Sequence, residues 1–162
     1  MGKRVLVAVD MNSESHASIL YGIELAARIE CSVVLIAISS PASPGKGSVP
    51  EASRGYVGTR RDTWMDRVVA ESQHRAVGLE IFVALGRFFE EIIRFIRSQP
   101  SVQFIVMSAP KQKEGKDGAK FAAALKGLQK EFEGEILLVE KAGQITRVSD
   151  LYLRTPAGET SA

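Results

Sequence analysis

The chain has 162 residues, 45% of them apolar and 25% charged, which is typical of one soluble globular domain with a buried core. Its 21 basic and 19 acidic residues give a formal charge of +2, so charge offers no reason to expect a nucleic acid or a membrane as a partner. The single Cys31 excludes an intramolecular disulfide. The first apolar run ends at Asp10, too short for a signal peptide, and no later run nears the length of a membrane span. We therefore expect a cytoplasmic protein.

The first part of the chain predicts two strands, a helix and a long loop. Residues 5–9 form a continuous apolar run, which is typical of a strand covered on both faces, and residues 32–38 are rich in β-branched side chains. Between them, apolar residues over 19–27 recur at helical spacing, and Ser13 is one of several candidate N-caps. The segment 39–62 is rich in proline and glycine, so we expect a flexible loop there.

The rest of the chain continues the alternation of strands and helices. Apolar faces at helical spacing and short apolar runs predict helices over 65–76, 89–96 and 121–132, and strands over 79–85, 102–107 and 135–139. This alternation predicts an α/β fold with a parallel sheet, right-handed crossovers and helices on both faces. In such folds, ligands bind beyond the carboxyl ends of the strands, where the winding direction reverses.

The sequence contains few motifs that indicate catalysis. It has neither a P-loop nor a Gly-x-Gly-x-x-Gly motif, and neither histidine has a carboxylate or cysteine at metal-ligand spacing. Asp10 ends the first strand as the nucleophile of a phosphohydrolase would, and Ser108 ends a later strand. However, Asn12 replaces the second aspartate, and no acidic pair follows strand 135–139 to hold magnesium. We expect no enzyme, no catalytic residue and no metal, with a phosphohydrolase that uses Asp10 as the alternative.

Five stretches, taken in order, are "RVLVAVDMNSESHASILYGIELAARI", "SVVLIAI" before a long loop, "EIFVALGRFFEEIIRFIR", "QFIVMSAPK" and "EILLVEKA". Together they resemble the universal stress protein family across residues 3 to about 142. The resemblance implies a doubly wound sheet of five parallel strands in the order 3-2-1-4-5 within a domain of residues 1–142. Residues 143–162 would be a C-terminal tail or dimerisation arm.

The resemblance also implies how the protein assembles and acts. Family members are usually homodimers paired through the last strands, so we expect a homodimer through the fifth strand and possibly the tail. The tail's apolar residues predict either packing across the dimer or an added edge strand. The expected function is that of a stress-response module, without a cofactor, acting through protein partners.

One branch of the family binds ATP through glycines after the fourth strand and a final Gly-Ser or Gly-Thr pair. There, backbone amides and a helix N-terminus hold the phosphates. In this chain Ser108 and Lys111 stand at the first two glycine places, and Phe121 and Ala122 stand at the final pair. We therefore expect no ATP binding through this motif.

Lysines in the same loop provide an alternative function, a sensor for a nucleotide such as ATP or AMP or for another phosphate ligand. Their point charges would contact phosphates directly, while Asp10 orients a base or ribose and the backbone near Ile38 lines the purine. The candidate ligand-binding residues are Asp10, Ser13, Ile38, Ser108, Lys111, Lys113, Lys116 and Lys120.

Overall fold

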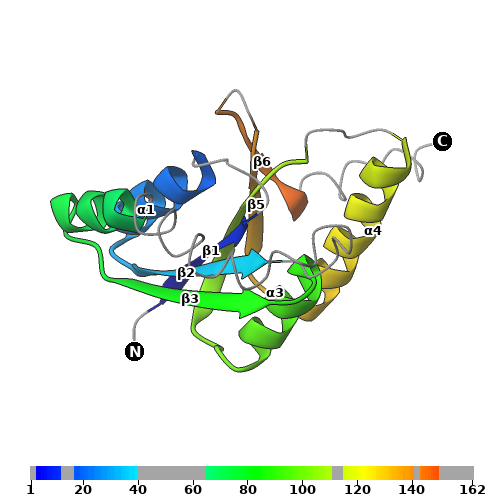
Figure 1. The fold of residues 1–162 in the computed structure, drawn as a ribbon, viewed down its shortest axis with the longest axis horizontal. Coiled ribbons are helices and arrows are strands. Elements are labelled where there is room, and N and C mark those ends of the chain that lie inside the picture. Colours follow the sequence, from blue (N-terminus) through cyan, green and yellow to red (C-terminus); the bar gives the residue numbers. More distant parts are fainter. Residues whose placement is uncertain (1–2, 12–16, 40–64, 111–114, 141–142, 150–162) are drawn as a thin grey trace, which may run out of the picture.

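The structure, a computed structural model, describes residues 3–11, 17–39, 65–110, 115–140 and 143–149. These residues form one sheet of six strands with helices on both faces (Figure 1). The strands are β1 (Arg4–Asp10), β2 (Ser32–Ser39), β3 (Leu79–Leu85), β4 (Val102–Ser108), β5 (Glu135–Val139) and β6 (Ile145–Arg147). The helices are α1 (Ala17–Ile29), a helix over residues 65–74, α3 (Phe88–Arg97) and α4 (Gly115–Glu131). In this described part, no helix is both long and apolar enough to cross a membrane.

The sheet has the order β3-β2-β1-β4-β5-β6, so the predicted strand order is confirmed. β1 to β5 pair in parallel, as the alternation of strands and helices predicted. The predicted sheet of five parallel strands is incomplete, because β6 pairs antiparallel with β5 and aligns Leu138 with Thr146. The tail therefore adds an edge strand to its own sheet. The predicted loop over 39–62 lies largely outside the described residues.

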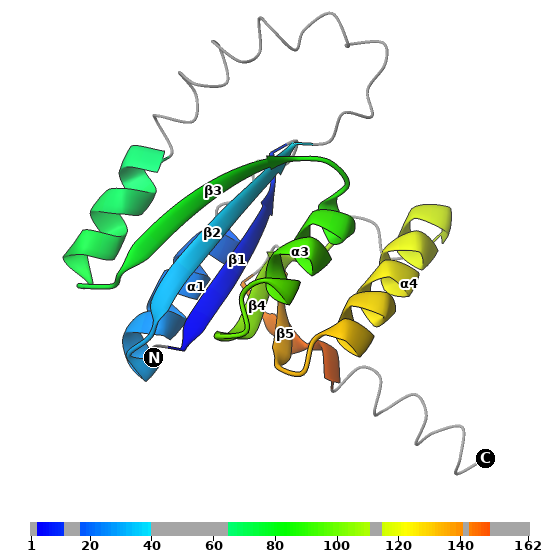
Figure 2. The same ribbon diagram turned by 90° about the horizontal axis from the view of Figure 1, so that it is seen from below.

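The core lies on both faces of β1, where Val5–Val9 are all buried. On one face Leu6 belongs to the buried cluster that includes Ile92 of α3 and Leu128 of α4. On the other face Val7 belongs to the cluster of α1 and the helix over 65–74. Figure 2 shows α3 and α4 on one side of the sheet and the other two helices on the opposite side. Each such side chain stabilises the fold by roughly 1.5–3 kcal/mol when it leaves water.

The helix α1 lies close to β1 because a glycine faces the strand. A Cβ atom added at Gly22 would overlap Cγ2 of Val7. Gly127 offers a contrast, because it also lies inside a helix, α4, but has no atom within 4 Å of such a Cβ position.

The tail turns back tightly before it joins the sheet. The Gly143 N–H donates to the Glu140 carbonyl at 2.9 Å, and the Glu140 N–H donates to the Gln144 carbonyl at 2.7 Å. Gly143 has a φ of 93°, which glycine adopts without strain. Directly after β6, Val148 is fully buried among the core residues of the α3 and α4 face. The tail thus contributes both hydrogen bonds and apolar packing to the domain.

The helix over 65–74 covers only part of the sheet face on which it lies. Its Val68 is buried in the same cluster as Leu79 and Ile81 of β3. Just beyond the helix, Arg75 forms ion pairs with Glu71 at 2.9 Å and with Glu24 of α1 at 3.6 Å. The hydrogen bond to Glu71 raises the pKa of the Arg75 guanidinium above its usual value. These exposed ion pairs connect the two helices on this face of the sheet.

We predict opposite effects for alanine at the two helical glycines. Gly22→Ala should lower the free energy of unfolding by about 1–3 kcal/mol, because the new methyl group overpacks the contact with Val7. Gly127→Ala should raise it by up to about 1 kcal/mol, because alanine favours a helix and nothing obstructs it. Urea unfolding followed by circular dichroism would measure both. Equal destabilisation by the two variants would contradict the close approach of α1 to β1.

We also predict that Val148→Ala lowers the free energy of unfolding by about 1–3 kcal/mol, because the substitution leaves a cavity in the core. The control is Gln144→Ala in the preceding turn, where the side chain is exposed and the change should stay within about 0.5 kcal/mol. Thermal unfolding monitored by calorimetry would compare them. A Val148 variant as stable as its control would show that the tail does not pack into the core.

Candidate functional site

The candidate site lies at the carboxyl ends of β1 and β4, where the winding direction reverses. These strands are neighbours at the centre of the sheet. The helix α1, which follows β1, lies on one face of the sheet, and α4, which follows β4, lies on the other face (Figures 1 and 2). In doubly wound sheets, ligands bind at the strand ends beside such a change of winding direction, which makes these strand ends the candidate site.

Asp10 is the last residue of β1, and it pairs directly with Ile38, the residue before the end of the adjacent strand β2. The Met11 N–H then donates to the Ile38 carbonyl at 2.9 Å and so extends the pairing by one residue. Asp10 is half-buried, whereas the Ile38 side chain is buried in the core on the α3 and α4 face. Of this pair, Asp10 is therefore the residue whose side chain is partly accessible.

Two serine hydroxyls join the start of α1 to the end of β4. Ser108 Oγ donates to Ser18 Oγ at 3.2 Å, and Ser18 is only 1% exposed. Sequence reasoning identified Ser108 but missed Ser18. The available signal was its spacing, because Ser18, Gly22 and Ala26 follow one another every four residues and share the buried face of α1. This small-residue face brings α1 close to the strand ends.

Of the four candidate lysines, the structure describes two, and both lie on α4. Lys116 and Lys120 are exposed on α4, four residues apart and therefore on one side of the helix. Ser13, Lys111 and Lys113 lie outside the described residues. The structure thus brings Asp10, Ile38 and Ser108 to neighbouring strand ends, and it places the two described lysines on the surface of the helix that follows.

The start of α4 packs through aromatic side chains. α4 begins at Gly115, which has a φ of 82°, so Phe121 already lies inside the helix. Its ring packs against Phe89 of α3 with centroids 5.4 Å apart in an edge-to-face arrangement, and Phe89 packs against Phe88 at 5.3 Å in the same way. Such pairs are favourable beyond the area that they bury. The Phe121 side chain therefore contributes to the α3–α4 interface.

The chemistry that these described residues offer is hydrogen bonding from one carboxylate and two hydroxyl groups. Asp10 and Ser108 both take part in further interactions, so neither residue is without a partner. No group of three or more histidine, cysteine or acidic residues within the described ranges could hold a metal ion. The arrangement suits recognition of a polar ligand or a structural link between elements.

Comparison with known proteins identifies relatives of the whole fold. The model of the universal stress protein family matches residues 1–119. The universal stress protein UspA from Lactobacillus plantarum has a TM-score of 0.60 and 15% sequence identity, over 84% of this chain and 96% of that chain. A member of the family from Burkholderia pseudomallei has a TM-score of 0.57 and 18% identity, over 85% of this chain and 95% of that chain.

A further similar structure is a universal stress protein in complex with cAMP. It has a TM-score of 0.57 and 10% identity, over 86% of this chain and 98% of that chain. At such identities, these solved structures establish the fold and no more. No curated protein sequence matches the chain.

We predict that the Ser18–Ser108 hydrogen bond is energetically coupled. Ser18→Ala should lower the free energy of unfolding by about 0.5–1.5 kcal/mol, and a double-mutant cycle with Ser108→Ala should give a coupling of at least about 0.5 kcal/mol. The matched control is Ser72→Ala, because Ser72 is also buried but its hydroxyl donates to the Val69 carbonyl of its own helix. The changes in the free energy of unfolding caused by Ser18→Ala and Ser72→Ala should be additive. Additivity of Ser18 with Ser108 would show that the link carries no stability.

Proposed function

Because the chain belongs to the universal stress protein family, we propose that it is a stress-response module that forms a homodimer and acts through protein partners. The proposal also states that it does not bind ATP through the glycine motif of the family. It assigns the protein to the cytoplasm and gives it no catalytic role. The family and the α/β fold support the proposed stress-response role. The start of α4 is the observation that supports the proposed absence of ATP binding through the glycine motif.

The position of Phe121 is the feature that argues against a phosphate cradle. A cradle needs amide groups that are free to donate, and these occur in the first turn of a helix. α4 starts at Gly115, so the place expected for the final glycine falls beyond the first turn and holds an aromatic ring packed on Phe89. Backbone amides at that depth donate within the helix. The backbone at Phe121 and Ala122 therefore offers no free amide to a phosphate.

The weaker enzymatic alternative rests on Asp10 alone. A phosphohydrolase needs magnesium to neutralise the phosphoryl oxygens and a second group to protonate the leaving group. Asp10 is half-buried at a strand end, and the described residues offer no set of acidic ligands for the ion. The proposal therefore treats Asp10 as a polar residue at the end of β1 and not as a nucleophile.

The homodimer must be compatible with the strand that the tail adds. β6 pairs with β5 from Leu137 to Val139, so it occupies the edge at which pairing through the fifth strand was expected. A partner at this end of the sheet would contact Ile145–Arg147. The expected pairing through the fifth strand stays a prediction, and it now requires contact with β6 or its displacement.

A nucleotide sensor is the second candidate, because Asp10 and Ser108 lie at the ends of the neighbouring strands β1 and β4. A nucleotide with one phosphate, such as AMP, would suit these strand ends better than ATP, because one phosphate needs fewer cationic groups than three. The structure of a related protein in complex with cAMP supports testing such ligands here. Lys116 and Lys120 would then supply positive charge from α4.

We predict that 1 mM ATP with magnesium leaves the melting temperature of the purified protein unchanged within about 1 °C. A ligand present at 100 times its Kd would stabilise the protein by about 2.7 kcal/mol and raise the melting temperature by several degrees. Calorimetry with ATP, AMP and cAMP makes the comparison. Tight, magnesium-dependent ATP binding would contradict the proposal.

Two variants then separate the candidate functions. If AMP or cAMP stabilises the protein, the sensor predicts that the stabilisation is lost in Asp10→Asn and reduced in Lys116→Glu/Lys120→Glu. Lys126→Glu/Lys130→Glu, on the later turns of the same helix, is the control for a change in net charge. Stabilisation that survives Asp10→Asn would place the ligand elsewhere.

A further inference from the structure

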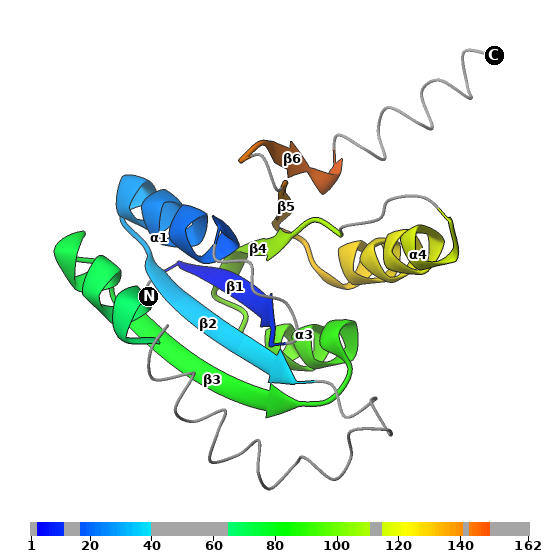
Figure 3. The same ribbon diagram turned by 45° about the horizontal axis from the view of Figure 1, so that its top comes forward.

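The edge of the sheet at β3 has the properties of an interface. β3 pairs with β2, and the sheet order places it at one end, opposite β6 (Figure 3). Exposed edge strands are normally short or carry charged residues or proline, because their free backbone groups would otherwise pair with other chains. β3 has seven residues, and Ile81–Leu85 contains no charge. Its side chains are unusually exposed for apolar residues, at 42% for Phe82, 51% for Val83 and 71% for Leu85.

The exposure is confined to part of the strand. Leu79, Ile81, Val83 and Leu85 point to one face of the sheet, because side chains alternate along a strand. The first two pack in the cluster that contains Val68, whereas Val83 and Leu85 are exposed. On the opposite face Phe82 contacts Phe95 of α3, with ring centroids 5.4 Å apart, and remains partly exposed. Within the described residues, a helix thus covers one half of β3 and leaves the other half exposed.

We propose that a second copy of this chain pairs antiparallel with β3 about a two-fold axis at Phe82. In this register Leu85 aligns with Leu79 of the partner copy, and Val83 aligns with Ile81 of the partner copy. The uncovered half of each strand therefore meets the half that a helix covers in the other copy. On the opposite face the two Phe82 rings meet across the axis, and such aromatic pairs stabilise antiparallel strands. The two sheets become one continuous sheet.

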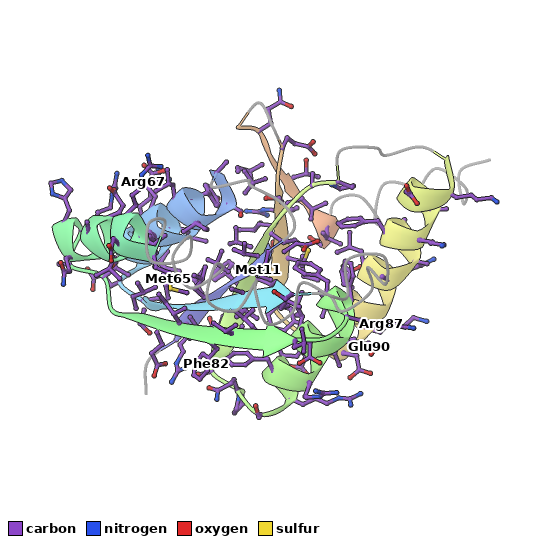
Figure 4. All side chains as sticks on the ribbon, viewed as in Figure 1. Met11, Met65, Arg67, Phe82, Arg87 and Glu90 are labelled. Atoms are coloured by element: carbon purple, nitrogen blue, oxygen red, sulfur yellow. The ribbon has the colours of Figure 1, made fainter. Side chains whose placement is uncertain are left out.

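The charges at the two ends of β3 favour the antiparallel direction. Glu80 lies near the start of the strand, where Arg4 approaches it at 3.0 Å. Arg87 follows the end of the strand, close to Glu90 at 3.5 Å (Figure 4). An antiparallel partner brings its Arg87 end to the Glu80 end of the first copy. Acidic and basic residues then flank an uncharged centre on both sides of the axis, and no like charges lie directly opposite each other, so the surface is compatible with a second copy of itself.

The opposite edge of the sheet fits a second copy less well. β6 has only three residues, and its Arg147 lies 3.7 Å from Glu135 of β5. A short strand with a charged residue is a usual protection of a sheet edge. The inference rests on the proposed function in one respect, that the protein forms a homodimer. It adds that the two copies meet at β3.

Sedimentation velocity of the full chain tests the interface. Val83→Lys/Leu85→Lys should weaken the dimer at least tenfold, because the lysines would have to be desolvated at the seam. The matched control is Leu20→Lys on α1, where the side chain is also 51% exposed. Melting curves establish that each variant folds. A wild-type chain that is monomeric at 100 µM, or a dimer that the double variant leaves intact, would overturn the proposal.

A disulfide trap tests the register. In a Cys31→Ser background, Phe82→Cys should form a covalent dimer under oxidation, since directly opposite residues of antiparallel strands meet the distance limits of a disulfide. Leu20→Cys should not. Efficient trapping through Ile145→Cys of β6, with none through Phe82→Cys, would overturn the assignment to β3. Nucleotide binding is measured separately, so a β3 dimer that binds ATP would refute the proposed function and leave the interface standing.

Discussion

The burial of the five central residues of β1 is the constraint from which the rest of the structure follows. Five consecutive apolar side chains, Val5–Val9, must leave water on both faces of the sheet. One face is covered by α1, which comes close enough because Gly22 lies over Val7. The other face is covered by α3 and α4. This requirement places β1 at the centre of the sheet, and the order β2-β1-β4 places the ends of β1 and β4, with Asp10 and Ser108, on neighbouring strands.

The ends of β1 and β4 and the early part of α4 are held in place by different interactions. The strand ends are connected through the hydroxyl groups of Ser18 and Ser108, whereas the early part of α4 is connected to α3 through Phe121 and Phe89. The end of β4 is thus joined to α1 by a hydroxyl–hydroxyl hydrogen bond, whereas α3 and α4 are joined by aromatic packing.

Much of the fold could be predicted from the sequence, because the signals are local. The apolar run of β1 and the periodic face of α3 indicate their elements directly, and the resemblance to a family supplied the strand order. An edge strand from the tail was one of two predicted options, but its bounds could not be predicted, since three residues show no periodicity and their strand conformation depends on pairing with Leu137–Val139. Ser18 was missed for a similar reason, because its hydroxyl partner is 90 residues away in the chain. Periodicity also could not locate the start of α4. The apolar pattern begins only at Phe121, whereas the helix begins at Gly115.

The order in which the strands leave the ribosome gives β6 a further consequence. A chain is synthesised from its N-terminus, and domains begin to fold as they emerge. β5 therefore becomes available before Ile145–Arg147 can cover it, and Val148 reaches the core later still. During that interval the β5 edge of the nascent protein is open to strands of neighbouring chains. The short turn at Gly143 keeps this interval brief, because it places the covering strand only a few residues behind the strand that it protects.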